Sequence, residues 1–168
     1  FSRPSALVFV LVVVGTIGSF GTLRDYVTVN STSRISYTEL SALSKLSTLK
    51  KGVVLSPPNQ NRTVFSPPQP QYDYITSSYI SALSGQPEYL SDQINLDITG
   101  INYQQKLKNA NRFYNTTDVS WTKEFLVENN ILYVYETPLR KLNIPYEKLN
   151  LETIFTSPEI TIYQVTGI

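Results

Sequence analysis

The stretch 125-FLVENNILYVYE-136 contains the transition from helix to strand that decides the fold class of this chain. Phe125 and Leu126 lie on the apolar face of a predicted helix. The pair Asn129–Asn130 ends that helix, because asparagine tolerates the left-handed conformation often needed at a helix terminus. Ile131–Tyr135 follows, rich in β-branched and aromatic residues, and predicts a strand. A helix that leads directly into an apolar strand is typical of α/β domains.

Upstream of this transition, the sequence predicts another helix followed by a strand. Ser36-Tyr37-Thr38-Glu39 is a capping box, in which the serine and glutamate side chains satisfy each other's free backbone N–H groups. The helix that begins there ends at Gly52, and Val53–Leu55 is predicted to be a short, fully apolar strand. The apolar stripe of this helix consists of Leu40, Leu43, Leu46 and Leu49.

The middle of the chain combines an extended loop with further helices. Residues 57–72 are rich in proline and glutamine, which predicts a loop with polyproline character. A helix is expected from Tyr74 to Ser84, closed by Gly85, and Glu88–Ser91 is a candidate strand. The next helix has an apolar face made of Tyr103, Leu107, Ala110 and Tyr114. The helix around Trp121 has Asp118 or Ser120 as its expected N-cap.

The C-terminal part of the chain reads as a β-hairpin. Leu151–Phe155 and Ile160–Val165 are strand-like and flank the turn Thr156-Ser157-Pro158-Glu159. Helices alternating with short apolar strands favour a small sheet covered by helices. We therefore expect an α/β fold: a small mixed-sheet domain with a C-terminal β-hairpin at one edge, preceded by a transmembrane helix.

The expected transmembrane helix is the run of twenty uncharged residues from Pro4 to Leu23, bracketed by Arg3 and Arg24. A helix of this length spans about 30 Å, the thickness of a bilayer's hydrocarbon core. The alternative is a secretory signal with its apolar core at Ala6–Val14. The chain opens at Phe1 and contains no methionine, so we expect a piece of a longer protein.

We accordingly predict three parts: 1–24 as the last membrane span of a larger protein, 25–35 as a linker, and 36–168 as a folded α/β domain. Small residues recur in the apolar run at a four-residue spacing, as in Gly15/Ser19 and Gly18/Thr22. This spacing lets helices approach closely in lipid. The expected partners are therefore the lipid bilayer and neighbouring transmembrane helices of the same protein.

Composition excludes several classes of function. The chain has no cysteine and no histidine, which removes disulfides, Ser-His-Asp and Cys-His catalysis, and the common zinc sites. The net charge from Asp25 onward is −1, since two of the basic residues, Arg3 and Arg24, lie upstream. This charge does not fit a nucleic-acid-binding protein. No phosphate loop or dinucleotide fingerprint is present, so no cofactor is expected.

Two groups of residues are candidates for a site. Tyr72, Tyr74 and Tyr79 lie next to the proline-rich loop, and such rings can stack on a sugar, although packing is the more ordinary role of a tyrosine. Glu88, Asp92 and Asp97 are acidic residues close together in the sequence. They form an acid/base or cation site only if the fold brings them together, and capping and loop roles are the ordinary alternative. No catalytic residue and no metal ligand is assigned.

The order of these segments resembles the C-terminal end of large bacterial membrane proteins of the GT-C-type glycosyltransferase superfamily, which includes the protein mannosyltransferase-like enzymes. The segments concerned are GVVLSPP, SALSGQPEYLSDQINLDITGINYQQKL, FLVENNILYVYE and LETIFTSPEITIYQV. The resemblance covers most of the chain from Ser36 onward. It lies in the order and hydrophobicity of the segments more than in signature residues.

The resemblance implies a non-catalytic extracytoplasmic domain of an enzyme that transfers a sugar from a polyprenyl-phosphate donor. The catalytic carboxylate of that superfamily lies on an early loop between membrane helices, which has no counterpart in this chain. The domain would then have a structural role or bind the acceptor, possible partners being a glycan or a lipid-linked sugar. The alternative is a pilin-like or singly membrane-anchored surface protein, although Pro4 and Ser5 depart from the pilin pattern.

Overall fold

The transition from helix to strand is present in the computed structural model, which describes residues 6, 8–17, 32–58, 64–73 and 78–167. Helix α6 (Val119–Glu128) leads into strand β4 (Ile131–Glu136). The Asp118 carboxylate caps α6 by accepting a hydrogen bond of 3.1 Å from the Trp121 N–H. Asn130 has a φ of +51°, as expected where this helix ends. The predicted helix, its cap and the following strand are confirmed.

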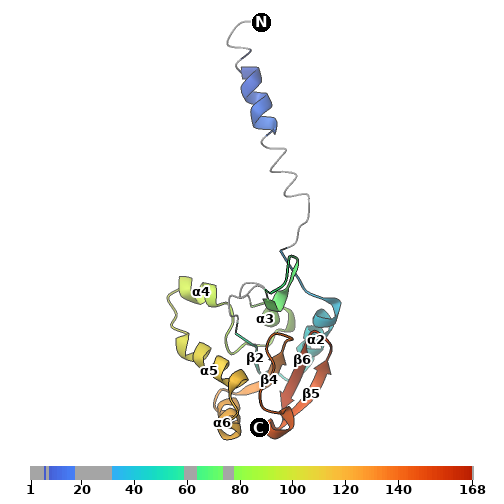
Figure 1. The fold of residues 1–168 in the computed structure, drawn as a ribbon, viewed down its shortest axis with the longest axis vertical. Coiled ribbons are helices and arrows are strands. Elements are labelled where there is room, and N and C mark those ends of the chain that lie inside the picture. Colours follow the sequence, from blue (N-terminus) through green and yellow to red (C-terminus); the bar gives the residue numbers. More distant parts are fainter. Residues whose placement is uncertain (1–5, 7, 18–31, 59–63, 74–77, 168) are drawn as a thin grey trace. The chain divides into compact units, whose positions relative to one another are not determined.

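Strand β4 is an inner strand of a four-stranded mixed sheet with the order β2-β4-β6-β5 (Figure 1). β2 (Val53–Leu55) runs parallel to β4, and β6 (Thr161–Val165) runs antiparallel to it. β5 (Leu151–Thr156) pairs with β6 and forms the edge opposite β2. The mixed sheet and its C-terminal hairpin are therefore confirmed.

The strand predicted at Glu88–Ser91 is not formed. Its only pairing is an isolated parallel bridge between Glu88 and Val54 on the outer side of β2. The Val54 N–H donates to the Pro87 carbonyl, and the Tyr89 N–H donates to the Val54 carbonyl, both at 2.8 Å. Tyr89 and Leu90 instead contribute buried side chains to the core.

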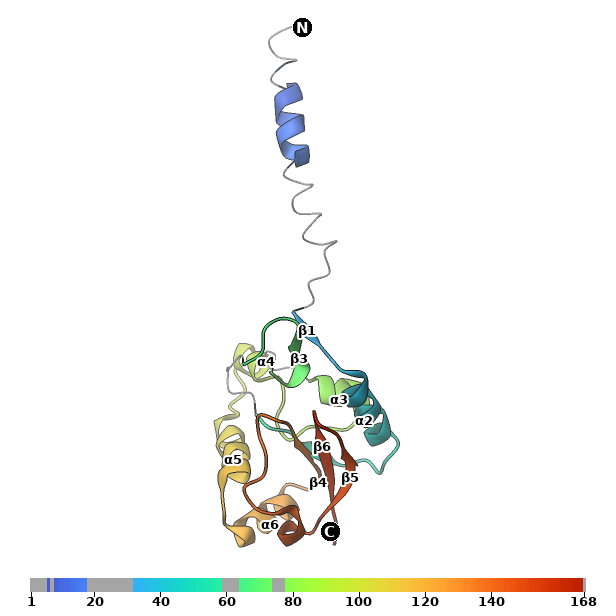
Figure 2. The ribbon, with the colours of Figure 1, turned by 45° about the vertical axis from the view of Figure 1, so that its right-hand side comes forward.

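Helices cover both faces of the sheet and create two separate cores (Figures 1 and 2). We call them the α5–α6 face and the α2–α3 face. The helices are α5 (Gln104–Asn115) with α6, and α2 (Tyr37–Ser47) with α3 (Tyr79–Ser84). Buried residues of the α5–α6 face include Leu55, Ala110, Phe113, Tyr114, Phe125, Leu126, Val134 and Val165. Those of the α2–α3 face are Ala42, Leu43, Leu46, Val54, Ile80, Tyr133, Tyr135, Ile160 and Ile162.

An irregularity in strand pairing distributes the apolar residues of β4 between the two cores. Val53 is opposite Ile131 but Val54 is opposite Tyr133, so Leu132 is an extra residue in β4. Ile131 therefore faces the α5–α6 core, whereas Leu132 and Tyr133 both face the α2–α3 core. Gly52 precedes this point, and a Cβ atom there would lie 2.5 Å from the Leu132 Cβ.

Helix α2 differs from its sequence prediction in three respects. Its N-cap is Ser36 as predicted, but the Glu39 carboxylate is buried and bonded elsewhere instead of completing the capping box. Leu40 is 45% exposed, because the buried side uses the i, i+3, i+4, i+7 positions and not a strict three-residue repeat. The helix ends at Ser47 with Thr48 as its C-cap, well before Gly52.

Several short elements complete the domain. Helix α4 (Gln93–Ile98), capped by Asp92, was not predicted, whereas α3 ends at Gly85 with a φ of +68° as expected. The predicted start of this helix, Tyr74, lies outside the described residues, and α3 itself begins at Tyr79, after its N-cap Ser78. A second, two-stranded sheet pairs β1 (Ser33–Arg34) with β3 (Gln69–Pro70) in parallel. The remaining short elements are η1 (Gln71–Asp73) and η2 (Tyr146–Leu149).

The chain divides into two units, Phe1–Thr32 and Ser33–Ile168. In the first unit, residues 8–17 are helical and their large apolar side chains are exposed. Among the described residues no helix has both the length and the apolar character needed to cross a membrane. Much of the predicted span Pro4–Leu23 lies outside those residues, so the transmembrane helix stays a prediction.

Candidate functional site

The carboxyl ends of β2 and β4 lie at the same edge of the sheet, because the two strands are parallel. Ligands in open α/β sheets bind just beyond such ends. The buried Tyr114 hydroxyl of α5 bonds the Leu55 carbonyl at 3.0 Å and the Tyr135 carbonyl at 2.7 Å. It thereby ties the last residue of β2 to β4. Polar side chains gather just beyond this point, and we take this edge as the candidate site.

A buried carboxylate, Glu39, lies at the centre of the polar group. Its Oε1 atom accepts hydrogen bonds of 2.7 Å from the hydroxyls of Tyr79 on α3 and Tyr135 on β4. Burial raises the pKa of the Glu39 carboxyl, since removal from water disfavours its charged form. The two tyrosine hydrogen bonds act in the opposite direction on this pKa, and Glu159 nearby raises it further.

A second carboxylate, Glu88, is bonded by three groups from two segments. It accepts from the Ser56 hydroxyl at 2.9 Å, and from the Ser81 N–H and hydroxyl at 3.2 Å each. Burial raises the pKa of the Glu88 carboxyl, while the bonds from Ser56 and Ser81 lower it. Glu88 therefore fastens the segment after β2 to the first turn of α3.

The outer part of the site is formed by the loop that follows β2 and by the hairpin turn. The Ser36 hydroxyl donates to the Glu159 carboxylate, joining the start of α2 to the β5–β6 turn. The buried Asp73 carboxylate accepts from the backbone N–H groups of Val64 and Phe65, at 2.9 and 3.1 Å, and so holds one part of the loop against η1.

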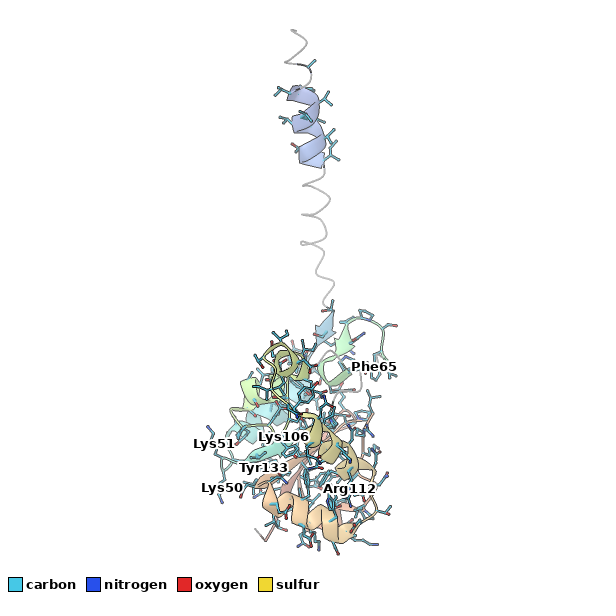
Figure 3. All side chains as sticks on the ribbon, turned by 90° about the vertical axis from the view of Figure 1, so that its left-hand side faces the viewer. Lys50, Lys51, Phe65, Lys106, Arg112 and Tyr133 are labelled. Atoms are coloured by element: carbon cyan, nitrogen blue, oxygen red, sulfur yellow. The ribbon has the colours of Figure 1, made fainter. Side chains whose placement is uncertain are left out.

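The three tyrosines predicted to contact a glycan have different surroundings. The Tyr79 hydroxyl is used by Glu39, so this side chain is part of the internal network. Tyr72 is half-buried, and its ring meets the exposed Phe65 ring edge-to-face, with centroids 6.3 Å apart (Figure 3 shows Phe65). Tyr74 lies outside the described residues. Of the two residues in this group that the structure describes, Tyr72 is better placed than Tyr79 to meet a ligand.

The acidic residues Glu88, Asp92 and Asp97 are each engaged separately. Asp92 caps α4 and bonds the side chain of Asn95, and Asp97 accepts from the Tyr103 hydroxyl at 3.0 Å. No group of three or more His, Cys, Asp or Glu side chains in the described part of the chain is arranged to bind a metal ion. These bonds are the capping and loop roles that the sequence offered as the alternative.

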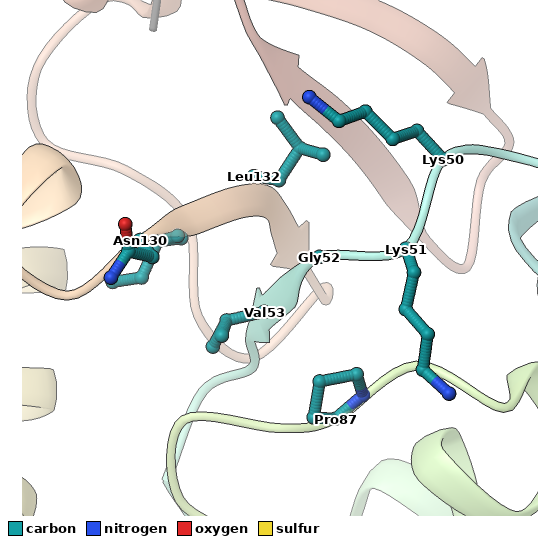
Figure 4. Close-up of a pocket in the computed structure, with 8 residues that line it drawn as sticks. Lys50, Lys51, Gly52, Val53, Pro87, Asn130 and Leu132 are labelled. Carbon is teal, nitrogen blue, oxygen red and sulfur yellow. The ribbon is translucent and has the colours of Figure 1, made fainter.

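A cavity of about 390 Å³ opens at the opposite, amino-terminal ends of β2 and β4 (Figure 4). It was not predicted from the sequence, and its lining includes Lys50 and Lys51. Their ammonium groups point in different directions, Lys50 past Leu132 and Lys51 past Pro87, and do not converge on one position. The cavity is therefore open space between strand ends without a focused anion site.

The polar groups at the candidate site form hydrogen bonds with one another. Within the described residues, every buried side-chain nitrogen or oxygen atom has a hydrogen-bond partner. Burial is the first cause of the raised pKa values of the Tyr79 and Tyr135 hydroxyls. The Glu39 carboxylate raises both pKa values further, and for Tyr79 the neighbouring Tyr135 has a larger effect than Glu39. Such hydroxyls are protonated donors at neutral pH. The arrangement therefore provides a stable polar junction between the loop, α2 and the sheet.

Glu39, Tyr135 and Glu159 were not singled out by sequence reasoning. The capping-box pattern at Ser36 offered a local role for Glu39, and Tyr135 matched an ordinary strand position. The alternation Tyr133-Val134-Tyr135 in an otherwise apolar strand is the one available signal, because a buried tyrosine hydroxyl needs a partner.

Comparison with known proteins gives one structural similarity. No protein-family model and no curated protein matches the chain. Its structure resembles the crystal structure of the C-terminal globular domain of an oligosaccharyltransferase from Archaeoglobus fulgidus, with 10% sequence identity and a TM-score of 0.47. The similarity covers 79% of this chain and 99% of the other. With a TM-score below 0.5, it carries no functional argument.

Proposed function

We propose that this chain is the C-terminal, non-catalytic domain of a GT-C-type membrane glycosyltransferase, located on the extracytoplasmic side of the membrane. The whole protein would transfer a sugar from a polyprenyl-phosphate donor to an acceptor. The order of segments from GVVLSPP to LETIFTSPEITIYQV supports this assignment. This domain then has a structural role, with weak acceptor binding as its secondary role.

The observation that carries the non-catalytic role is the internal use of the candidate acids. The Glu39 carboxylate accepts from two tyrosine hydroxyls, and Glu88 accepts from Ser56 and Ser81. A general acid or base must lie within hydrogen-bond distance of the group that it protonates or deprotonates. Carboxylates whose bonds hold α2, α3 and the strand ends together are committed to the fold instead.

A surface for weak acceptor binding exists where the Phe65 and Tyr72 rings meet. Both lie on the proline-rich segment after β2, and Phe65 is exposed to solvent. An aromatic pair of this kind can stack on the apolar face of a sugar ring. We expect weak affinity, because ordering a loop on binding costs conformational entropy that two rings only partly offset.

The enzymatic part of the proposal is tested with the 168-residue chain in detergent micelles and a polyprenyl-phosphate-linked sugar. We expect no glycosyl transfer and no hydrolysis. Turnover that is lost in Asp92→Asn or Asp97→Asn would place an active site in this domain and overturn the proposal. Reading the coding sequence upstream of Phe1 is the second test: many apolar spans support the proposal, and a short basic leader supports a singly anchored surface protein.

The binding part is tested by titrating short glycans against the isotope-labelled chain and following NMR chemical shifts. Tyr72→Ala should abolish any saturable shift. Tyr79→Phe is the matched control, because it removes a hydroxyl already bonded to Glu39 and leaves the Phe65 and Tyr72 rings unchanged. Equal losses in both variants would show that the shifts report on the fold and not on a glycan contact.

A further inference from the structure

Helix α4 carries a group of exposed isoleucines. Ile94 and Ile98 are 45% and 75% exposed, and Ile101 just beyond the helix is 56% exposed. Positions four residues apart lie on the same side of a helix. No residue of α4 is buried, and Leu96 is its partly buried contact with the α5–α6 core. Single exposed apolar residues are ordinary, but a group on one short helix indicates an interaction surface.

The backbone holds these isoleucines in fixed positions. The Asp92 carboxylate accepts from the Asn95 N–H at the start of α4. At its end the Ile101 N–H donates to the Leu96 carbonyl at 2.9 Å, and the Gly100 N–H donates to the Asp97 carbonyl at 3.1 Å. With Gly100 at a φ of +68°, these two bonds form a Schellman motif. The surface is therefore preorganised and loses little conformational freedom on contact.

The isoleucines lie at the end of the domain where the chain enters it. Helix α4 and the pair β1–β3 occupy this end, and α6 occupies the opposite end (Figures 1 and 2). The exposed residues Val64 and Phe65 belong to the loop that leads into β3 (Figure 3). Two separate segments thus present apolar side chains at the end that carries Ser33.

We propose that Ile94, Ile98 and Ile101 form a membrane-contact surface that inserts into the interfacial layer of the bilayer. The inference rests on the part of the proposed function that places Pro4–Leu23 in the bilayer. Residues 24–32 connect that segment to Ser33, and nine residues span at most about 30 Å. Residues 24–32 therefore keep this end of the domain close to the lipid. There, the transfer of isoleucine side chains out of water is favourable in free energy.

The charges around α4 favour contact through apolar side chains over attraction to anionic lipid. Asp92 and Asp97 are the titratable groups of this segment, and both carboxylates are hydrogen-bonded within the domain, to Asn95 and to the Tyr103 hydroxyl. Lysines lie on the neighbouring α5, where Lys106 stacks over the Tyr89 ring at 5.3 Å. We therefore expect contact with neutral phosphatidylcholine as well as with anionic lipid.

The chain has no cysteine, which permits single-site labelling of the complete 168-residue protein. Ile98→Cys, labelled with an environment-sensitive fluorophore, is reconstituted in phosphatidylcholine vesicles with or without doxyl-labelled lipid. We expect a blue shift of emission and a loss of intensity with doxyl lipid. Val127→Cys on α6 is the matched control: Val127 is 55% exposed, and its label should show neither change. Phe9→Cys in the apolar helix reports insertion of the anchor.

The outcomes separate this inference from the proposed function. Quenching at Phe9→Cys without quenching at Ile98→Cys overturns the contact surface and leaves the anchor intact. The absence of quenching at both positions overturns both. A blue shift at Ile98→Cys without doxyl quenching identifies a protein neighbour and contradicts a lipid contact. Adding Ile94→Asp, a charge at an exposed position, should reduce the quenching at Ile98→Cys while the thermal unfolding curve stays unchanged.

Discussion

The two faces of the sheet are buried in different ways. The α5–α6 face is closed by aromatic packing: the Phe113 ring contacts Tyr114 and Phe125 at centroid distances of 5.3 and 5.7 Å, and Trp121 stacks on Phe125 at 5.1 Å. The α2–α3 face also buries apolar side chains, but it encloses the Glu39 carboxylate and the two hydroxyls that bond it. The stability of the α5–α6 face depends mainly on how well its side chains fill the available volume. The stability of the α2–α3 face depends also on the hydrogen bonds to its buried carboxylate.

This difference predicts how the stability of each face responds to substitutions and to pH. On a packed face, the loss of side-chain volume lowers stability at any pH, because removing apolar atoms leaves a cavity. A face with a buried carboxylate responds to protonation and to the loss of single hydroxyls. Tyr72, at the end of the proline-rich segment, packs against the core of this polar face.

The largest effect is expected from removing a ring on the aromatic face. Phe113→Ala should lower the free energy of unfolding by about 3–5 kcal/mol, the usual cost of a buried phenylalanine. Chemical denaturation measures this loss, which should be the same at acidic and neutral pH. Val127→Ala at an exposed position is the control and should change stability little. A loss for Phe113→Ala that varies strongly with pH would break the distinction between the two faces.

A smaller, pH-dependent effect is expected at Glu39. Glu39→Ala leaves two hydroxyls without their acceptor and should lower the free energy of unfolding by about 1–3 kcal/mol. The loss is limited because the substitution also removes a buried charge, which offsets part of the penalty. The raised pKa of Glu39 means that the folded state binds its proton more tightly than the unfolded chain. Its contribution to stability is therefore complete below the unfolded pKa and declines as the pH rises through the folded pKa.

Glu39→Gln tests the sign of this dependence. Glutamine keeps an oxygen acceptor for the tyrosines and cannot ionise, so the decline in stability with rising pH should become shallower than in the parent. Some decline should persist, because the Glu88 pKa is also raised. Denaturation curves from about pH 4 to pH 8 measure the slope. An unchanged slope would show that Glu39 does not titrate differently in the folded state.

Two tyrosines allow a matched comparison between the faces. Tyr79→Phe removes a donor to the buried Glu39 and should cost roughly 1–2 kcal/mol. Tyr163→Phe removes a hydroxyl bonded at 2.9 Å to the half-exposed Glu136, which water can solvate instead, and should cost less than about 1 kcal/mol. Equal costs measured by denaturation would contradict the view that burial of the carboxylate decides the difference.

The smallest effect is expected at the outer surface of the aromatic face. The Arg112 guanidinium lies 4.0 Å from the Trp121 ring centroid and 3.6 Å from the Asp118 carboxylate. Both charged side chains are about half exposed, so Arg112→Gln should cost no more than about 1 kcal/mol. Trp121 is the single tryptophan of the chain, so its fluorescence emission should shift in Arg112→Gln. Lys108→Gln is the control and should leave the emission unchanged.

Local signals predicted the elements around the aromatic face. The Asp118 cap, the Asn129–Asn130 stop and the apolar positions of α5 and α6 each act within one or two turns of helix. Where local signals were misleading, a distant contact changed the outcome. Leu40 fits a three-residue stripe, but α2 packs through positions 39, 42, 43 and 46. Helix α4 was missed because it is only six residues long, and its apolar residues Ile94, Leu96 and Ile98 are too few and too closely spaced for a recognisable helical period.

The candidate site could be predicted only in part. Tyr72 and Tyr79 both pack against the α2–α3 core, but the sequence does not show that the Tyr79 hydroxyl is bonded to Glu39, and their contact with a glycan stays a prediction. Glu88, Asp92 and Asp97 are neighbours in sequence, whereas the structure gives each its own partners in Ser56 and Ser81, Asn95, and Tyr103. Sequence proximity of acids says little about shared geometry, because caps and turns use carboxylates individually.

The sequence by itself determined the α/β class, the order of the main helices and strands, and the absence of histidine and cysteine chemistry. Caps, apolar periodicity and composition act locally or apply to the whole chain, so they can be read without a fold. Only the tertiary structure decided that Glu39 meets Tyr79 and Tyr135, which lie 40 and 96 residues away. A buried carboxylate is stable only where donors from other elements meet it, and that meeting depends on how two helices close over one face of the sheet.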